Sequence, residues 1–541
     1  MKKSILLLLS VCICTYSINA QSKLTETEKL TSLAKIHGFL KYYHPEVGKG
    51  KFEWDKEFLK YLPQVLKATD KESLSTIYIN WIDSLGTIEV CKKCNSKENY
   101  FDKNFDLSWF QDTTVFNNSI ALKLKYIEEN RNQEQNFYAS NEPVGKIKIT
   151  NEPVYHDLEY PNEEYRLLGL FKYWNIIEYF YPYKYLTDQN WDSVLKEMIP
   201  KIRYASNKTE YQSTVKEFIA KLDDSHAWIS FSDERPKYLP IKISYIENKA
   251  VVIGFYNDSI ANLNKLKLGD IVLKINDFDV ETEIEKNLKY EAGSNTNVKI
   301  KNTYNRIFSG LENIVNLAIE RNGRIEQIRV NRYNFNDFNY WDNPDRVKSK
   351  SINDEIGYIN MASVKSQDIT GIFESFDTKK AIIIDLRNYP AFIYRIFSRY
   401  VNSEKRDFSK IYSPNINYPS RYSYKDNLQT SSSKKAFKGK IILLVNEESM
   451  SRSEFTAMAF QTADNVITVG NQSAGADGDV VVFEYIGGYR TAMSGNGILY
   501  PNGTETQRKG VKIDIEIKPT INGLSQGRDE ILEKAIEIAK E

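Results

Sequence analysis

The segment Lys440–Glu454, KIILLVNEESMSRSE, decides how the fold is interpreted. Its first seven residues, Lys440–Asn446, form an apolar run that predicts a buried strand. A polar turn with three serines follows, and Phe455–Gln461 is then predicted to be helical. A serine on such a strand-to-helix turn exposes its hydroxyl while neighbouring amides point at one spot. The segment therefore predicts a nucleophile beside a backbone oxyanion hole.

Residues 341–541 alternate predicted strands and helices around this segment. Ile356–Asn360, Ala381–Asp385 and Val466–Gly470 are short apolar runs, each typical of a strand buried within a sheet. The strand at Ala381–Asp385 ends in the turn Arg387–Pro390. This alternation predicts an α/β core built on one sheet.

Residues 236–340 are rich in β-branched side chains that alternate with polar ones, which predicts a separate β domain. In Leu266–Asn276, Gly269-Asp270 forms a turn before an alternating strand. This piece resembles the corresponding turn and strand of PDZ domains, which bind peptides by adding a strand to a sheet edge. An ordinary hairpin is the alternative. Val315–Val330 holds two more predicted strands around Asn322-Gly323.

The N-terminal part contains an internal repeat, with copy one in residues 21–150 and copy two in residues 151–235. Leu33–Leu85 aligns with Leu170–Leu222 without a gap at an offset of 137 residues, and 11 of the 53 pairs are identical. Apolar residues recur at helical spacing in Trp191–Arg203, which predicts a helix. We therefore predict a duplicated helical module. The fold class is α+β and multidomain.

Composition excludes two classes of protein. The 541 residues include 73 basic and 72 acidic side chains, a net charge of +1, which argues against a nucleic-acid partner. Hydrophobic residues make up 41% of the chain, which argues against a disordered protein. No segment approaches the length of about 20 apolar residues that a membrane span requires.

Residues 1–20 have the features of a cleaved signal peptide. Lys2 and Lys3 precede the apolar run Ile5–Ile13, and Ala20 offers a small residue at the cleavage point. A periplasmic or secreted protein is expected. A lipoprotein anchored through Cys12 is the less favoured alternative, because bulky Val11 stands where a small residue is expected.

The mature chain keeps two cysteines, Cys91 and Cys94, in a C-x-x-C spacing. In an oxidising compartment this pair is expected to form a local disulfide. Free thiols, a redox role or half of a metal site are the alternatives.

Several motifs, in this order, resemble the tail-specific or C-terminal processing serine peptidases, over about residues 222–541. They are Gly357–Ile359, Ile384–Asn388, Ser449–Glu454, Val469-Gly470 through Gly475, and Gly510–Ile515. The resemblance implies a twisted sheet with helices, carrying an inserted PDZ domain. It also implies that Ser451, the second serine of the Ser-x-Ser-x-Ser-Glu run, is the nucleophile.

The resemblance further implies which base assists Ser451. The bacterial processing enzymes carry a lysine directly after the glycine matched by Gly475, and this chain has Ala476 there. The tricorn-like branch instead uses a histidine in a Leu-x-x-Ser-His-Ala stretch, which Leu222–Ala227 matches. His226 is then the base, and Ser225 helps to orient its ring.

The remaining site residues also come from the resemblance. Glu505 is the expected carboxylate behind the imidazole, although the register to Gly510 could place Gln507 there. The amide of Arg452 is one oxyanion donor. The second donor, a glycine amide in the family, falls at Ala391.

We therefore expect a periplasmic or secreted serine endopeptidase that cleaves unfolded or C-terminal peptide segments. Its partner is a peptide or unfolded protein, and no metal or organic cofactor is implied. The alternative is a non-catalytic peptide- or ligand-binding protein on the same scaffold. No oligomeric state is predicted.

Overall fold

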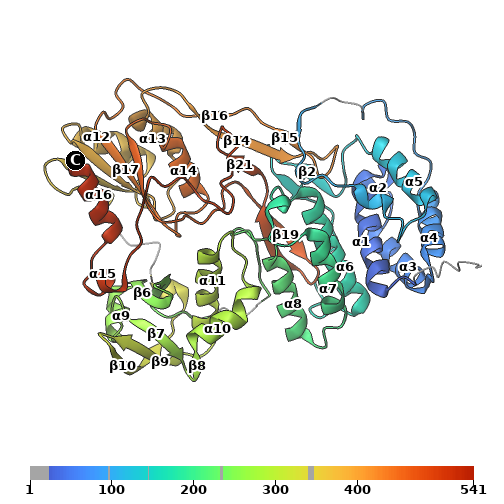
Figure 1. Ribbon diagram of the computed structural model, residues 1–541, viewed down its shortest axis with the longest axis horizontal. Helices are drawn as coiled ribbons and strands as arrows, with labels where there is room; N and C mark the ends of the chain where they lie inside the picture. Colours follow the sequence, from blue (N-terminus) through green and yellow to red (C-terminus); the bar gives the residue numbers. More distant parts are fainter. Residues whose placement is uncertain (1–22, 95–97, 144, 232–235, 339–346) are drawn as a thin grey trace, which may run out of the picture.

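The computed structural model describes residues 23–94, 98–143, 145–231, 236–338 and 347–541. The predicted signal peptide, residues 1–20, lies outside the described residues. The N-terminal helices occupy one end of the molecule, and the large sheet of the C-terminal half occupies the other (Figure 1). A small β domain lies beside the large sheet.

The N-terminal part consists of two matching sets of helices. The first set is α1 (Glu26–Tyr43), α3 (Trp54–Lys67) and α4 (Lys71–Ser84), with the short α2 (Pro45–Gly48) between α1 and α3 and α5 (Asn118–Glu129) packed beside α4. The second set is α6 (Glu163–Phe180), α7 (Trp191–Arg203) and α8 (Lys208–Ala220). Each set begins its second helix with a tryptophan whose indole N–H donates to a carbonyl of the first helix. Trp54 donates to His37 (3.2 Å) and Trp191 to Trp174 (3.1 Å), at equivalent positions of the repeat.

The β domain is an antiparallel sheet with three α-helices. Its strands are β5 (Ile241–Ile246), β6 (Lys249–Phe255), β7 (Ile271–Ile275), β9 (Ile314–Arg321) and β10 (Arg324–Asn331), in the order β10-β9-β7-β6-β5. The short β8 (Phe278–Asp279) also pairs with β7. Strands β7, β9 and β10 are those expected from the sequence. The helices are α9 (Asp258–Leu263), α10 (Val280–Asn287) and α11 (Thr296–Phe308), and α11 packs beside the edge strand β5.

The C-terminal core is built on a six-stranded sheet in the order β11-β12-β13-β17-β18-β22. Strands β12 (Ile356–Asn360), β13 (Ala381–Asp385), β17 (Lys440–Val445), β18 (Val466–Gly470) and β22 (Ile515–Glu516) run parallel, and β11 (Ser349–Ser351) runs antiparallel. Helices α12 (Ile369–Ser375), α13 (Tyr394–Val401) and α14 (Arg452–Phe460) cover one face. Helix α16 (Glu530–Lys540) covers the other. Alternate residues of each central strand face these two layers, so the strands are apolar throughout.

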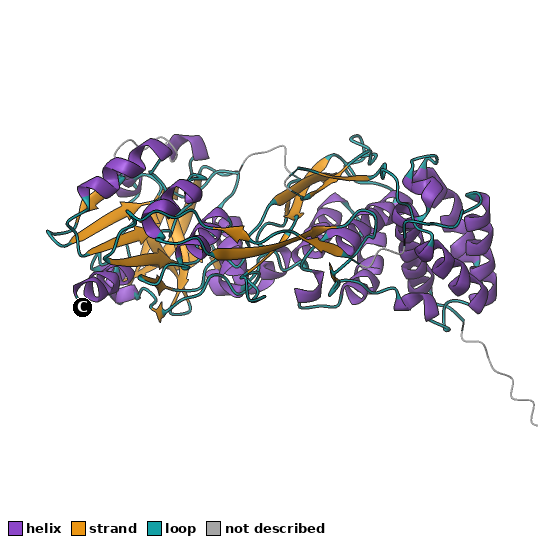
Figure 2. Ribbon diagram, turned by 90° about the horizontal axis from the view of Figure 1, so that it is seen from above, coloured by secondary structure: helices purple, strands orange, loops and turns teal. Residues whose placement is uncertain are grey.

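Two smaller sheets connect the core to the helical part (Figure 2). In one, β14 (Asp407–Pro414) pairs with β15 (Tyr422–Tyr424), β16 (Leu428–Gln429) and β21 (Gly497–Leu499). In the other, β19 (Val480–Tyr485) pairs with β20 (Tyr489–Ser494), which pairs in turn with β4 (Trp228–Ile229). The pairing of β4 with β20 brings the segment after α8 onto the C-terminal half.

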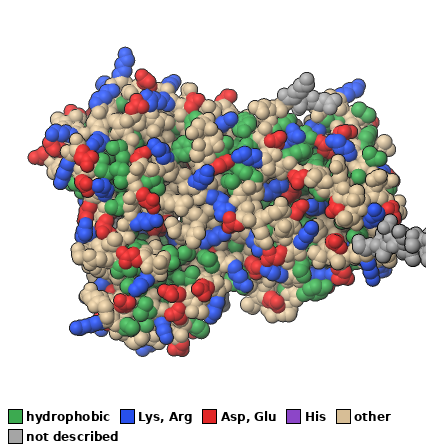
Figure 3. Space-filling model, in the orientation of Figure 1, with side chains coloured by type: hydrophobic (Ala, Val, Ile, Leu, Met, Phe, Trp, Pro, Cys, Tyr) green, Lys and Arg blue, Asp and Glu red, His purple; other side chains and the backbone are tan. Residues whose placement is uncertain are grey.

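The described residues contain no helix of the length and apolar character that crossing a bilayer requires. Basic and acidic side chains are interleaved over the face shown in Figure 3. Cys91 and Cys94 are joined by a disulfide bond.

Candidate active site

Ser451 lies where strand β17 leads into helix α14, at the N-cap of that helix. Its backbone has φ 53° and ψ −113°, a region that L-residues rarely adopt and that costs on the order of 1–3 kcal/mol. The side chain is half-buried. A sharp, strained turn of this kind presents a nucleophile at the end of a sheet.

The three serines of the turn have different environments. Ser449 and Ser453 are fully buried, and both hydroxyls donate to the carbonyl oxygen of Leu386, at 2.7 and 2.6 Å. These two side chains fix the turn against the end of β13. Ser451 is the serine that remains accessible for chemistry.

A buried carboxylate holds the nucleophile turn in place. Glu454 accepts hydrogen bonds from Ser473 Oγ (2.6 Å), from the amides of Gly475 (2.8 Å) and Ala476 (3.0 Å), and from the amide of Ser451 (3.1 Å). Burial raises the pKa of Glu454, and these four hydrogen bonds oppose that shift. The amide of Ser451 also donates to Ala476 O (2.9 Å). The segment 473–476 is thereby fastened to the start of α14.

His226 follows α8 and precedes β4, and its ring is buried. The Nδ1 atom lies 2.9 Å from Ser494 Oγ, at the end of β20. The Ser494 hydroxyl donates to Asp224 Oδ1 (2.9 Å), because an ionised carboxylate only accepts. A hydroxyl has one proton, so Ser494 must accept from a protonated Nδ1. The unprotonated Nε2, which has no hydrogen-bond partner among the described residues, is then the basic nitrogen.

Asp224 is the charged end of this chain of hydrogen bonds. It is fully buried and also accepts from the amides of His226 (3.0 Å) and Ser494 (2.7 Å) and from Gln507 Nε2 (3.3 Å). Burial lowers the pKa of His226, whereas the charges of Asp224 and Asp479 raise it. The imidazole is therefore neutral near pH 7, as a general base must be.

Residues 355–517 match the model of peptidase family S41. This part of the chain is an S41 peptidase domain. It is a domain of the serine-type peptidases. The match includes Ser451 and Ser494 and begins after both the helical part and the β domain.

Solved structures of CPAF share the fold of the chain. Mature CPAF complexed with lactacystin aligns with a TM-score of 0.56 and 13% identity, over 70% of this chain and 98% of that one. A mutant of CPAF aligns with a TM-score of 0.57 and 14% identity, over 70% and 97%. At such identities the likeness concerns the fold alone. No curated protein matches the chain significantly by sequence.

The expected oxyanion donors of the S41 domain lie on neighbouring loops. Arg452 is the first residue of α14, where a backbone amide has no acceptor within the helix. Its guanidinium Nη1 donates to Pro390 O at 3.3 Å, so the loop that contains Ala391 lies beside the nucleophile turn. Arg387 anchors the start of this loop through Asp385 (2.7 Å) and Asp529 (2.8 Å).

Ser225 does not contact the imidazole. Its hydroxyl donates to Ala474 O (3.1 Å) and accepts from the amide of Ser294 (2.9 Å). Ser225 therefore ties the histidine loop to the segment 473–476, which also binds the amide of Ser451. The loop of His226 and the turn of Ser451 are thus attached to the same short segment.

The expected partner of His226 is replaced by other residues. Glu505 Oε1 accepts from Tyr185 OH (2.6 Å) and Lys103 Nζ (3.1 Å), which direct it toward the helical part. Its alternative, Gln507, reaches Asp224 rather than the ring. The geometry thus assigns the position behind the imidazole to Ser494 and Asp224.

Sequence reasoning missed Ser494, Asp224 and Glu454. Asp224 stands in the matched stretch Leu222–Ala227, and Glu454 ends the serine run, so both carried a signal. Ser494 carried none. Ala476 is buried and occupies the place of the family's lysine, so no amine is available there. Within the described residues no group of three or more His, Cys, Asp or Glu side chains could hold a metal ion.

Proposed function

We propose that the chain is a serine endopeptidase in which Ser451 is the nucleophile and His226 the general base. The observation that carries the proposal is the hydrogen bond from Ser494 Oγ to Asp224. It leaves Ser494 only an accepting role toward His226 Nδ1–H, and so keeps the lone pair of Nε2 free to take a proton.

The chemistry proceeds in two steps. In the first, Ser451 Oγ attacks the peptide carbonyl carbon as its proton moves to His226 Nε2, and the amides of Arg452 and Ala391 receive the developing oxyanion. His226 then returns the proton to the departing amine. In the second step, a water attacks the acyl carbon as its proton moves to His226, and the ester bond then breaks as His226 returns that proton to Ser451 Oγ. Asp224, through Ser494, stabilises the transient imidazolium.

Peptide delivery is assigned to the β domain. Strand β5 is the edge of its sheet, with α11 alongside. A small pocket of about 30 Å³ lies between them; its lining includes Leu239, Ile241, Ile243, Tyr304 and Phe308. An edge strand beside such a pocket supports binding of an extended peptide by strand addition, as in PDZ domains. The proposed substrates are accordingly unfolded or C-terminal peptide segments.

The proposed location is the periplasm or the exterior. The disulfide between Cys91 and Cys94 supports it, because such bonds persist in oxidising compartments. Intact mass of the exported protein should correspond to a chain beginning at Gln21. An exported mass that retains residues 1–20 would contradict the predicted cleavage.

One observation favours a second function, peptide binding without cleavage. His226 Nε2 is buried without a partner, and Ala476 stands where the family's lysine is expected. Catalytic hydrogen bonds are often completed only when substrate binds, so the first function is retained. If binding is the function, Ser451→Ala keeps the biological role.

Labelling with a fluorophosphonate, followed by intact-mass measurement, tests the proposal. The wild type should gain one adduct, and Ser451→Ala and His226→Ala should gain none. His156→Ala, at an exposed histidine outside the site, is the matched control and should label as the wild type does. An adduct that survives Ser451→Ala contradicts the nucleophile, and one that survives His226→Ala contradicts the base.

A further inference from the structure

The side chain of Arg452 contacts two aromatic rings beside Ser451. Its guanidinium lies over the rings of Tyr389 and Phe392, 5.0 and 5.5 Å from their centroids. Both rings are largely exposed, at 54% and 64%. The cation thus lies close to two aromatic rings that are exposed to solvent, and it belongs to the residue directly after Ser451.

The partners of Arg452 differ from those of Arg387 and Arg508. Arg387 binds two aspartates, and Arg508 forms an ion pair with Asp188. In the described part of the chain, Arg452 has no carboxylate partner, and its one hydrogen bond goes to the neutral carbonyl of Pro390. A guanidinium has five N–H donors in a planar fork that matches a carboxylate. Most of those donors remain available.

We propose that the Arg452 side chain binds a carboxylate of the substrate close to the scissile bond. This inference rests on the proposed function and names the substrate class of that site. Neighbouring Cα atoms are about 3.8 Å apart, and an extended peptide advances about 3.3 Å per residue. A group on the residue after the nucleophile therefore reaches substrate positions within about two or three residues of the bond.

The two rings help to position the guanidinium. Tyr389 and Phe392 attract the cation through their faces, and this interaction limits the positions that the side chain adopts. The carboxylate has two sources with the same chemistry: an Asp or Glu side chain, or the C-terminus of the substrate.

Matched fluorogenic peptides test the inference. One pair differs only in Glu against Gln beside the scissile bond. A second pair differs only in a free against an amidated C-terminus two residues beyond that bond. We expect the wild type to favour the acid of at least one pair by about 10-fold or more in kcat/KM. The pair that shows the preference identifies the source of the carboxylate.

The variants assign that preference to Arg452. Arg452→Gln should bring the acid-to-neutral ratio close to one, and Arg452→Glu should favour a Lys peptide over the Glu peptide. Arg395→Gln, at an exposed arginine of α13, is the matched control and should keep the wild-type ratio. A wild-type ratio near one in both pairs overturns the inference. So does a preference that survives Arg452→Gln.

A binding measurement separates this inference from the proposed function. Calorimetric titration of the same peptides into Ser451→Ala reads the preference for a carboxylate without any cleavage. If the wild type neither hydrolyses the peptides nor labels with the fluorophosphonate, the proposed function fails. The acid-to-neutral ratio of affinities in Ser451→Ala, compared with Ser451→Ala/Arg452→Gln, still decides the role of Arg452.

Discussion

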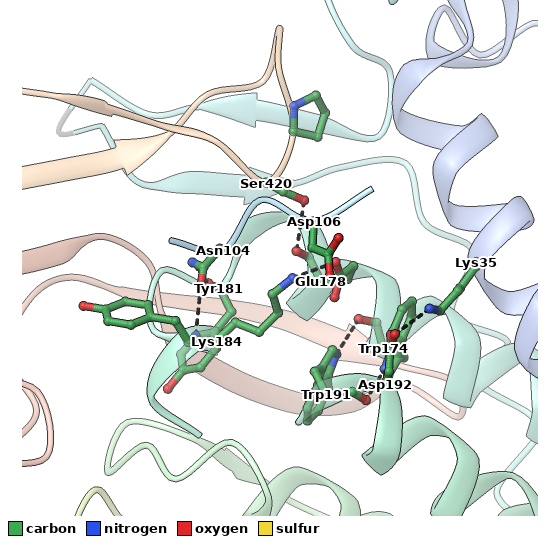
Figure 4. A network of polar contacts seen from close by, with 12 residues as sticks. Lys35, Asn104, Asp106, Trp174, Glu178, Tyr181, Lys184, Trp191, Asp192 and Ser420 are labelled. Atoms are coloured by element: carbon green, nitrogen blue, oxygen red, sulfur yellow. Dashed lines mark hydrogen bonds and ion pairs between the residues drawn. The ribbon is translucent and has the colours of Figure 1, made fainter. Parts of the chain in front are cut away.

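Lys172 binds Asp55 (Nζ to Oδ2, 2.9 Å), and its equivalent in the other repeat copy, Lys35, binds Asp192 (2.5 Å), the equivalent of Asp55. In each ion pair, therefore, the lysine belongs to one copy and the aspartate to the other. This exchange is the pattern of a symmetric dimer interface, here between two halves of one chain. Figure 4 shows the Lys35–Asp192 pair, with Trp174 and Trp191 beside it.

The two ion pairs differ in burial, and this predicts different energies. Lys172 and Asp55 are 8% and 5% exposed, whereas Asp192 is 43% exposed. We expect Lys172→Met to lower the free energy of unfolding by about 3–5 kcal/mol, because it removes the cation that pairs with two buried carboxylates, Asp55 and Glu152. Lys35→Met, its matched control, should cost at most about 1 kcal/mol. Urea denaturation measures both, and equal losses would contradict the argument.

Gly38 lies against Asn175, its own equivalent in the second copy. A Cβ added to Gly38 would lie 1.7 Å from Asn175 Oδ1. Asn175 cannot move freely, since its Nδ2 donates to Ala34 O (3.0 Å) and Phe171 O (2.8 Å). Gly38→Ala should cost about 1–3 kcal/mol of stability through overpacking.

Two further variants test that explanation for Gly38. Gly38→Ala combined with Asn175→Ala should be more stable than the sum of the two single changes predicts. Gly371→Ala, in α12 where an added Cβ meets nothing within 4 Å, should be neutral or slightly stabilising. Strict additivity of the first pair would exclude a direct clash.

His44 should make folding sensitive to acid. Burial lowers its pKa from 6.5 to about 4, with Glu46 opposing the shift. Between these two values the unfolded chain binds a proton that the folded chain does not, so stability falls as pH drops from 6.5 toward 4. For His44, the free energy of unfolding is expected to fall by about 3 kcal/mol over this pH range.

Comparison of variants isolates the contribution of His44. His44→Tyr introduces the residue that the second copy has at this position, Tyr181, and should flatten the pH dependence of unfolding free energy between pH 4.5 and 7. Burial also lowers the pKa of His37, so some slope should remain. His156→Ala should keep the wild-type slope. A His44→Tyr protein with an unchanged slope would refute the assignment.

The pairing of Ser494 with Asp224 predicts a distinctive pH profile of labelling. The pKa of His226 is lowered, so the wild-type rate of fluorophosphonate labelling should rise with pH and reach its midpoint below pH 6.5. Asp224→Asn removes a charge that raises this pKa, and should move the midpoint lower still. It should also slow labelling by about 100-fold or more.

Ser494→Ala should slow labelling to a similar extent, because the Nδ1 proton loses its acceptor. Thr491→Ser is the matched control on the same strand, since the Thr491 hydroxyl binds Trp228 O and not the histidine. It should keep the wild-type profile. Normal labelling by Ser494→Ala would show that Ser494 does not position the imidazole.

The parts of the fold that the sequence predicts are those set by local patterns. Strands β12, β13 and β18 match their predicted ranges, because runs such as Ala381–Asp385 are apolar on both faces. The two copies of the helical module follow from an alignment without gaps. Their reciprocal ion pairs do not, because the sequence does not state how the copies pack.

Only part of the site can be predicted from the sequence, for the same reason. Ser451 belongs to a recognisable turn, and the stretch Leu222–Ala227 singled out His226. Ser494 reaches His226 through the pairing of β4 with β20, across 268 residues of chain. Glu505 and Gln507 are two residues apart in a loop, and only the folded chain shows that one faces Tyr185 and the other Asp224.

The segment recognised as an S41 domain is smaller than the machinery proposed for the reaction. Residues 355–517 contain Ser451, Ser494 and Glu454, but not His226, Asp224 or Ser225. Those three follow the last helix of the duplicated helical module, and they precede the β domain in the sequence. An excised S41 segment would therefore hold the proposed nucleophile without the proposed base. In this chain the helical module supplies that base, if the proposal holds, and a truncation that removed the module is expected to abolish the proposed activity.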